Sequence, residues 1–187
     1  GAGPRRVRRA GLAAIPEDRL HEGVSPSLAV EDNLALMAYA SAPLSSGPFL
    51  RRPRIRERAV DLIERFDIRT PGPTTPTRLL SGGNVQKVLL ARELSSDPKV
   101  LVAASPTRGL DVGAIETVRG VLVEAANRGV GVLLVSEDLD EVLSLSDRVA
   151  VIFEGRILAV LDRADADLET IGLLMGGDTS RLTTGGE

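Results

Sequence analysis

Apolar and polar positions alternate along this chain with two periods, which separate predicted helices from predicted strands. Residues 54–66 carry apolar side chains three or four positions apart, the spacing of one face of an α-helix. Residues 112–127 show a second stripe of this kind, and Ser81 is a suitable N-cap for a helix that ends near residue 94. Short apolar runs at residues 99–104 and 129–136 indicate buried strands.

The remaining predicted elements are shorter. They are a strand over residues 11–15, a helix over 30–40, a helix over 139–144, strands over 147–154 and 156–162 joined by a Glu154-Gly155 turn, and a helix over 168–175. Because strands and helices alternate along the chain, we predict an α/β fold with a parallel sheet covered by helices.

Composition and charge are those of a soluble globular domain. The chain has 187 residues, of which 43% are hydrophobic and 26% charged, and its formal net charge is -3. This charge gives no reason to expect nucleic acid as a partner, so the cluster Arg5, Arg6, Arg8 and Arg9 favours a solvated face. The absence of cysteine excludes disulfides and Cys-based zinc sites and fits a reducing compartment. We expect His21, in a charged loop, to be exposed rather than a ligand.

The usual phosphate-binding loop, G-x-x-x-x-G-K-[S/T], does not occur in the sequence. Both lysines, Lys87 and Lys99, follow residues other than glycine. Ser81-Gly82-Gly83 nevertheless opens a predicted helix, whose N-terminus offers free amides and the positive end of the helix dipole. Such an end suits a terminal phosphate, although simple helix capping is the favoured explanation of this motif when it is considered alone.

Five motifs follow one another along the chain. They are AAIPEDRLHEGVSPSLAVEDNLAL (13–36), LSGGNVQ (80–86), VLVAASPT (100–107), GLD (109–111) and LLVSEDLDEVLSLSDRVAVI (133–152). Their order resembles the second half of the ATP-binding cassette of ABC transporters, over about residues 5–176. In that family they resemble the membrane-coupling loop, the signature motif, the strand with the metal and base carboxylates, the loop that meets the opposing cassette, and the switch strand with its helix.

The first motif is similar to the coupling loop in the second cassette of tandem ATPases that drive sugar- and nucleoside-type importers. The resemblance implies a P-loop NTPase-like cassette over residues 1–176 that lacks its P-loop strand, with a helical signature-motif subdomain at about 25–95 and core strands and helices at 96–161. We expect residues 177–187 to form a disordered tail. We also expect residue 1, a glycine, to mark a cut inside a longer protein, and an unpaired sheet edge to make the isolated chain marginally soluble.

Three positions depart from an active cassette. In the family this strand ends in Asp-Glu, which hold Mg²⁺ and orient the attacking water, but here the two places are Ala104 and Ser105. Alanine cannot bind the metal, and a serine hydroxyl is too weak a base. The switch histidine is replaced by Glu137, and a carboxylate about 4 Å from a phosphate charge costs roughly 4 kcal/mol at an effective dielectric constant near 20. The resemblance therefore implies that this site does not hydrolyse ATP.

The signature motif is intact, and in the family it closes over ATP and Mg²⁺ held mainly by the facing cassette. The residues that the resemblance assigns to that ATP are Ser81, Gly82, Gly83, Asn84 and Gln86. It assigns Asp111 to the cassette interface, with an ordinary helix cap as the alternative, and Glu17 to the coupling loop, with a generic charged turn as the alternative.

The resulting hypothesis is a second-cassette fragment of the ATP-binding subunit of an importer for nucleosides or simple sugars. Its expected partners are a facing cassette in the first half of the same protein and transmembrane permease subunits, at the cytoplasmic face of the membrane. No apolar run approaches the roughly 18 residues of a membrane span, so we expect a peripheral position. A stand-alone, non-catalytic interaction module is the alternative. A soluble ABC protein acting in translation or DNA maintenance is less favoured, because the PEDR loop points to importers and no strongly basic face is present.

Overall fold

The computed structural model describes residues 3–40 and 42–180 of the chain. They divide into two compact units, Gly1–Val135 and Ser136–Glu187, and each unit forms a sheet of its own. No helix in the described ranges is long and apolar enough to cross a lipid bilayer.

A three-stranded parallel sheet forms the centre of the first unit. Its order is β1 (Leu12–Ile15), β4 (Val100–Ala104), β5 (Gly131–Val135), and the pairing sets Ala13 opposite Leu101 and Leu101 opposite Val132. The predicted α/β fold with a parallel sheet is thereby confirmed. Strand β5 lies at one edge of this sheet.

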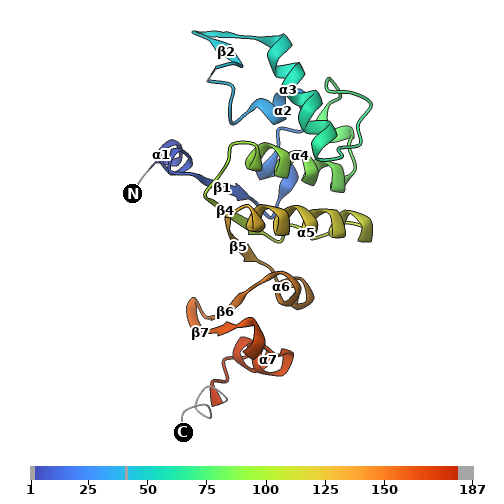
Figure 1. The fold of residues 1–187 in the computed structure, drawn as a ribbon. Coiled ribbons are helices and arrows are strands. Elements are labelled where there is room, and N and C mark those ends of the chain that lie inside the picture. The colour runs from blue at the N-terminus through green and yellow to red at the C-terminus, as the bar shows by residue number, and fades with distance from the viewer. Residues whose placement is uncertain (1–2, 41, 181–187) are drawn as a thin grey trace. The chain divides into compact units, whose positions relative to one another are not determined.

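Seven helical segments belong to this unit among the described residues. They are α1 (Pro4–Arg9), η1 (Arg19–Gly23), α2 (Val30–Ala35), α3 (Arg52–Arg65), η2 (Thr77–Leu79), α4 (Gly82–Leu94) and α5 (Val112–Asn127). Helices α2, α3 and α4 contact one another in one region, while α4 also contacts β1 and α5 contacts β5 (Figure 1). Two short strands, β2 (Ser45–Ser46) and β3 (Phe49–Leu50), form a hairpin before α3. Helix α4 is almost entirely buried, and its buried side chains include the polar or charged Gln86, Lys87, Arg92 and Glu93 as well as apolar ones.

Helix α2 is shorter than the sequence predicted. We expected a helix over residues 30–40, but α2 ends at Ala35 and the chain continues in turns. The Leu36 amide donates to the Asn33 carbonyl, and the Ala38 amide donates to the Ala35 carbonyl. The hydrogen bonds here therefore join residues three positions apart, whereas those of an α-helix join residues four apart. The apolar pattern persists through this stretch, which is why it suggested a longer helix.

The second unit combines a hairpin with two helices. Strands β6 (Arg148–Phe153) and β7 (Arg156–Asp162) are antiparallel, and α6 (Leu139–Leu145), η3 (Arg163–Asp165) and α7 (Leu168–Met175) complete the unit. The turn residues Glu154 and Gly155 both have positive φ, at 45° and 76°, which is the conformation that a tight two-residue hairpin requires. The predicted hairpin is therefore confirmed.

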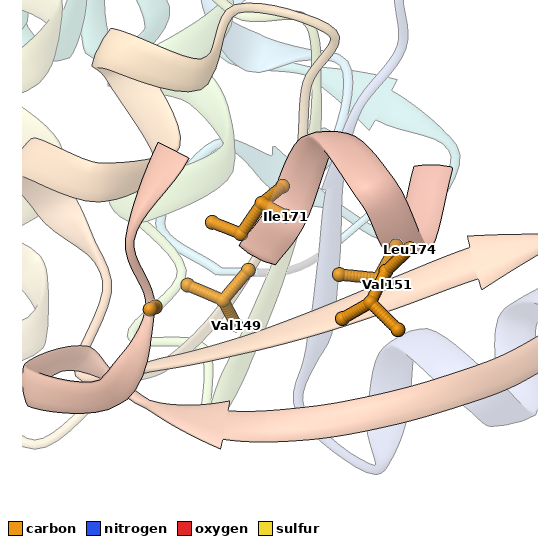
Figure 2. Close-up of a cluster of buried hydrophobic side chains, with 5 residues drawn as sticks. Val149, Val151, Ile171 and Leu174 are labelled. Carbon is orange, nitrogen blue, oxygen red and sulfur yellow. The ribbon is translucent and has the colours of Figure 1, made fainter. Parts of the chain in front are cut away.

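A small apolar core holds α7 against this hairpin. Its buried side chains are Val149, Val151, Ala166, Ile171 and Leu174. Figure 2 shows Ile171 and Leu174 of α7 facing Val149 and Val151 of β6. The alternation along β6 explains this arrangement, because residues two apart lie on the same face of a strand.

This core predicts a large difference between two isoleucines of the second unit. Ile171 is 1% exposed and Ile152 is 64% exposed. We expect Ile171→Ala to destabilise the unit by about 2–5 kcal/mol through lost burial and a residual cavity. Ile152→Ala should change stability by less than about 0.5 kcal/mol. Urea unfolding followed by circular dichroism measures both, and equal losses in the two variants would contradict the packing described here.

Candidate functional site

The N-terminus of α4 is open to solvent and no side chain caps it. Ser81 and Gly82 are exposed, and the Ser81 backbone has the extended conformation of an N-cap residue. The prediction that its hydroxyl accepts a first-turn amide is wrong, because this oxygen accepts a hydrogen bond from Nδ2 of Asn84 at 2.9 Å instead. The first turn of α4 therefore has no side-chain cap from Ser81 at the positive end of the helix dipole.

Asn84 connects this helix end to the loop before it. Its Oδ1 accepts a hydrogen bond from the Arg69 amide at 2.7 Å, while its Nδ2 holds the Ser81 hydroxyl. The side chain thus orients Ser81 and fixes the loop beside it. Gln86 lies elsewhere: it is 2% exposed, and its Nε2 has no hydrogen-bond partner in the part of the chain that the structure describes. The structure therefore does not bring Gln86 to the exposed face that holds Ser81 and Gly82.

The start of α4 packs closely against the start of α5. Gly83 is buried, and a Cβ added there would lie 2.8 Å from the Cβ of Ala114, closer than such atoms approach in real proteins. This contact places the turn Ser81-Gly82-Gly83, which we call the signature turn, beside Asp111. Asp111 immediately precedes α5. Two predicted motifs that are far apart in the sequence are therefore brought together.

Asp111 caps α5: its Oδ1 accepts a hydrogen bond from the Ala114 amide at 2.9 Å. The structure thus contains the helix cap that was the alternative for this residue, and its interface role stays a prediction. Two large apolar side chains beside these motifs are exposed, Leu79 at 63% and Val112 at 74%.

The two positions at the end of β4 carry no carboxylate. Ala104 and Ser105 are both partly buried, and Ser105 has a φ of 43°, a conformation that is costly for residues other than glycine. Its amide donates to the Val135 carbonyl at 2.7 Å, which holds the turn after β4 against β5. Glu137 is exposed in the second unit, next to Asp138, which caps α6 through the Glu141 amide.

The coupling loop contacts the loop after β4 through two side chains. Glu17 forms an ion pair with Arg108. Arg19 donates from Nη1 to the Arg108 carbonyl at 2.8 Å and from Nη2 to the Gly109 carbonyl at 3.5 Å. These residues line an open groove of about 500 Å³ together with Asp18, Leu20 and Glu22. Arg19 could not be predicted as a site residue from the sequence, because its partners here are backbone carbonyls, which no residue pattern records.

Buried charges anchor the far end of α4. Arg92 donates to the Gly23 carbonyl at 2.8 Å and to Glu93 at 2.9 Å, and Glu93 also accepts from Arg8 at 2.9 Å. Burial lowers the pKa of the Arg92 guanidinium from its usual range, and the charge of Glu93 opposes that shift. Removing one partner of such a group leaves an uncompensated buried charge. The network therefore joins α4 to α1 and to Gly23 at the end of η1.

A second ion pair holds the middle of α4. The Lys87 ammonium, which is nearly buried, donates to the carbonyl of Asp67 at 2.7 Å and to its carboxylate at 2.8 Å. This hydrogen bond and the charge of Lys87 lower the pKa of the Asp67 carboxyl below its ordinary value. One of the two lysines of the chain is thus occupied in a structural contact. Within residues 3–40 and 42–180, no group of His, Asp and Glu side chains is arranged to hold a metal ion.

The approach of α4 to α5 predicts a destabilising variant and its rescue. Gly83→Ala inserts a methyl group where only 2.8 Å is available, so we expect a loss of about 1–3 kcal/mol. Adding Ala114→Gly removes the opposing methyl group and should recover most of that loss. Gly120→Ala is the matched control, because a Cβ there meets nothing within 4 Å, and it should stabilise α5 by about 0.5–1 kcal/mol. Urea unfolding compares the four proteins, and a double variant no more stable than Gly83→Ala would refute the contact.

Comparisons with known proteins find relatives over nearly the whole chain. The guanosine import ATP-binding protein NupO of Bacillus subtilis is 43% identical over 178 residues, covering 95% of this chain and 35% of that protein. The glucose import ATP-binding protein TsgD13 of Haloferax volcanii is 43% identical over 187 residues, covering 99% and 34%. The nucleoside import ATP-binding protein NupA of Lactococcus lactis is 40% identical over 174 residues, covering 93% and 34%. The chain spans about a third of the length of these relatives.

The fold also matches a solved structure. The ATP-binding cassette MJ0796, solved as a dimer in a post-hydrolysis state bound to ADP and Pi, aligns with a TM-score of 0.70 and 21% identity, over 85% of this chain and 66% of that one. No protein-family model matches the sequence. The chain therefore has the fold of an ATP-binding cassette and is homologous, over nearly its full length, to part of the ATP-binding proteins of nucleoside and sugar importers.

Proposed function

We propose that this chain is a second-cassette part of the ATP-binding subunit of an ABC importer for nucleosides or simple sugars. It presents LSGGNVQ to ATP and Mg²⁺ that are held mainly by a facing cassette, the first half of the same protein. The import ATP-binding proteins to which it is similar, named for guanosine, other nucleosides and glucose, support the class of solute.

One observation carries this proposal: the signature turn and the predicted interface loop converge on one exposed surface. Gly83 lies against Ala114, so the open N-terminus of α4 stands beside Asp111 and the exposed Val112. Uncapped backbone amides and a positive dipole end attract a phosphate group, and they stabilise charge that develops on it during transfer. Exposed apolar side chains at the same surface suit a contact with a second cassette.

The site that this chain builds for itself is proposed to be non-hydrolytic. Ala104 has no group that binds a metal, and no carboxylate stands beside it to orient water, because the next residue is Ser105. Glu137 adds a negative charge at the position that the resemblance assigns to the switch residue. In this proposal, ATP turnover belongs to the composite site that the signature completes.

The membrane subunits are proposed to dock near the coupling loop. Glu17, which the resemblance places at the coupling position, lies at an open groove together with Arg19 and Arg108. Such a concave surface with charges of both signs suits a segment of a permease subunit. The chain then works as a peripheral protein at the cytoplasmic face of the membrane.

Ser81→Asp separates the phosphate role from the structural role of the helix end. Aspartate is a good N-cap and favours the helix dipole, so α4 should keep its stability or gain up to about 1 kcal/mol. The same carboxylate repels a γ-phosphate, so ATP turnover of the complex isolated from its source should fall at least about a hundredfold. Ser46→Asp, at an exposed serine of β2, adds the same charge elsewhere and should leave turnover unchanged. Unaltered turnover in Ser81→Asp would refute the proposal.

The native size of the protein decides between the importer and the stand-alone module. We expect an antibody raised against residues 54–66 to detect, in fractionated cells of the source organism, a membrane-bound species much larger than 19.8 kDa. The relatives are about three times as long as the chain, which supports that expectation. A soluble species near 19.8 kDa would contradict the tandem arrangement and favour a non-catalytic interaction module.

A further inference from the structure

Arg19 occupies a position between three segments of the first unit. It begins η1, two residues after Glu17, and its side chain is half-buried. The guanidinium donates to the carbonyls of Arg108 and Gly109, which are 89 and 90 residues away in the sequence. A guanidinium is planar and carries several donors in a fixed fork, so it can hold two neighbouring carbonyls at once.

The loop that receives these bonds is short and locally folded. Within it, the Arg108 amide donates to the Ser105 carbonyl at 3.1 Å and the Leu110 amide to the Thr107 carbonyl at 3.2 Å. Each bond joins residues three positions apart and so closes a turn. Gly109, inside the second turn, has a φ of 66°. Such turns shape the loop but do not fix its position relative to the rest of the unit. Arg19 supplies a contact from outside the loop.

The same guanidinium lies beside the signature glycine. A Cβ added at Gly82 would stand 3.1 Å from Nη2 of Arg19, and a Cβ added at Gly109 would stand 3.7 Å from the same nitrogen. The same nitrogen of Arg19 is therefore close to both Gly82 and Gly109. The absence of a side chain at Gly82 leaves room for the guanidinium.

A second contact joins the same two loops. Glu17 forms an ion pair with the Arg108 side chain, while Arg19 holds the Arg108 carbonyl. Both groups of the ion pair are largely exposed, so salt and water weaken their attraction. The hydrogen bonds of Arg19 are also exposed, but they join a charged donor to backbone carbonyls, and bonds of this type are stronger than those between neutral groups.

We infer that Arg19 is a positioning residue that holds the 105–110 loop against the signature turn. It fixes the distance between Gly82 and the loop that leads to Asp111, and it makes both move with the coupling loop. The consequence for ATP rests on the proposed function: a shift of the coupling loop at the membrane subunit changes the geometry offered to the partner's γ-phosphate. Neither the sequence motifs nor the relatives' names assign this role to Arg19.

Hydrogen–deuterium exchange tests the positioning directly. In Arg19→Ala, we expect the amides of residues 107–111 to exchange about tenfold faster, because one external contact to the loop is lost. Lysine keeps the charge, but its ammonium cannot bond both carbonyls in the way that a planar guanidinium does. Arg19→Lys should therefore give a smaller increase in the exchange rate of the same peptide. Arg78→Ala removes an exposed arginine close to the signature turn and should leave this peptide unchanged. An unchanged peptide in Arg19→Ala, or an increase spread over the whole first unit in Arg19→Lys, would overturn the inference.

A double-mutant cycle with Gly82 tests the contact between the two residues. Gly82→Ala places a methyl group 3.1 Å from the guanidinium, so it should displace Arg19 and accelerate exchange at residues 107–111. In the Arg19→Ala background, the added methyl group meets no guanidinium and should cause no further acceleration. Equal effects of Gly82→Ala in both backgrounds would show that Arg19 does not link the glycine to the loop.

These measurements need no nucleotide, so they distinguish a failure of this inference from a failure of the proposed function. In the complex isolated from its source, Arg19→Lys should lower kcat for ATP turnover while KM stays within about twofold, because the partner cassette supplies most ATP contacts. A change in KM alone would contradict a positioning role. If exchange responds as expected while turnover does not change, the positioning stands and the ATP role of the surface is wrong.

Discussion

The close approach of α4 to α5 is the constraint on which the candidate surface depends. Gly83 lies against Ala114 with no space for a side chain, and this contact sets the open helix end beside the loop that ends at Asp111. Buried contacts fix α4 farther along, where Lys87 bonds to Asp67 and Arg92 to Gly23. A helix held at several points transmits little flexibility to its first turn, so the exposed amides keep one orientation. Preorganised dipoles of this kind stabilise phosphate charge without a reorganisation cost.

Charge at this surface is distributed so that the helix end stays free. Asp111 is engaged by the Ala114 amide and Glu17 by Arg108, so the two nearest predicted carboxylates have partners of their own. Ser81 is held by Asn84, a neutral group, and leaves the first turn of α4 uncovered. The guanidinium of Arg19 adds a positive charge beside Gly82. The N-terminal end of the helix dipole and the guanidinium are both positive, which favours an anion at this surface.

Periodicity in the sequence predicted the elements well, and side-chain contacts much less well. Helix α5, helix α7 and strand β7 have the predicted bounds, because their apolar spacing and flanking turn residues agree. The predicted cap by Ser81 was wrong because Asn84, three residues later, competes for the hydroxyl. Arg19 could not be found, since its acceptors are carbonyls that lie 89 and 90 residues away and are common to every residue type. Patterns record local preference, whereas these contacts exist only once the chain has folded.

The chemistry that this chain keeps and the chemistry that it lacks are carried by different parts of the protein. Metal binding and water activation need carboxylate side chains, and the end of β4 carries Ala104 and Ser105 instead, which is why the proposed function assigns no hydrolysis to this site. The phosphate stabilisation proposed for the signature turn would be carried by backbone amides and by glycines that leave room, and it would depend on the packing of α4. A cassette can therefore lose its own catalytic site and still complete the site of a partner. In the proposed function, the composite site therefore depends on the packing around Gly83 and not on the side chains at the end of β4.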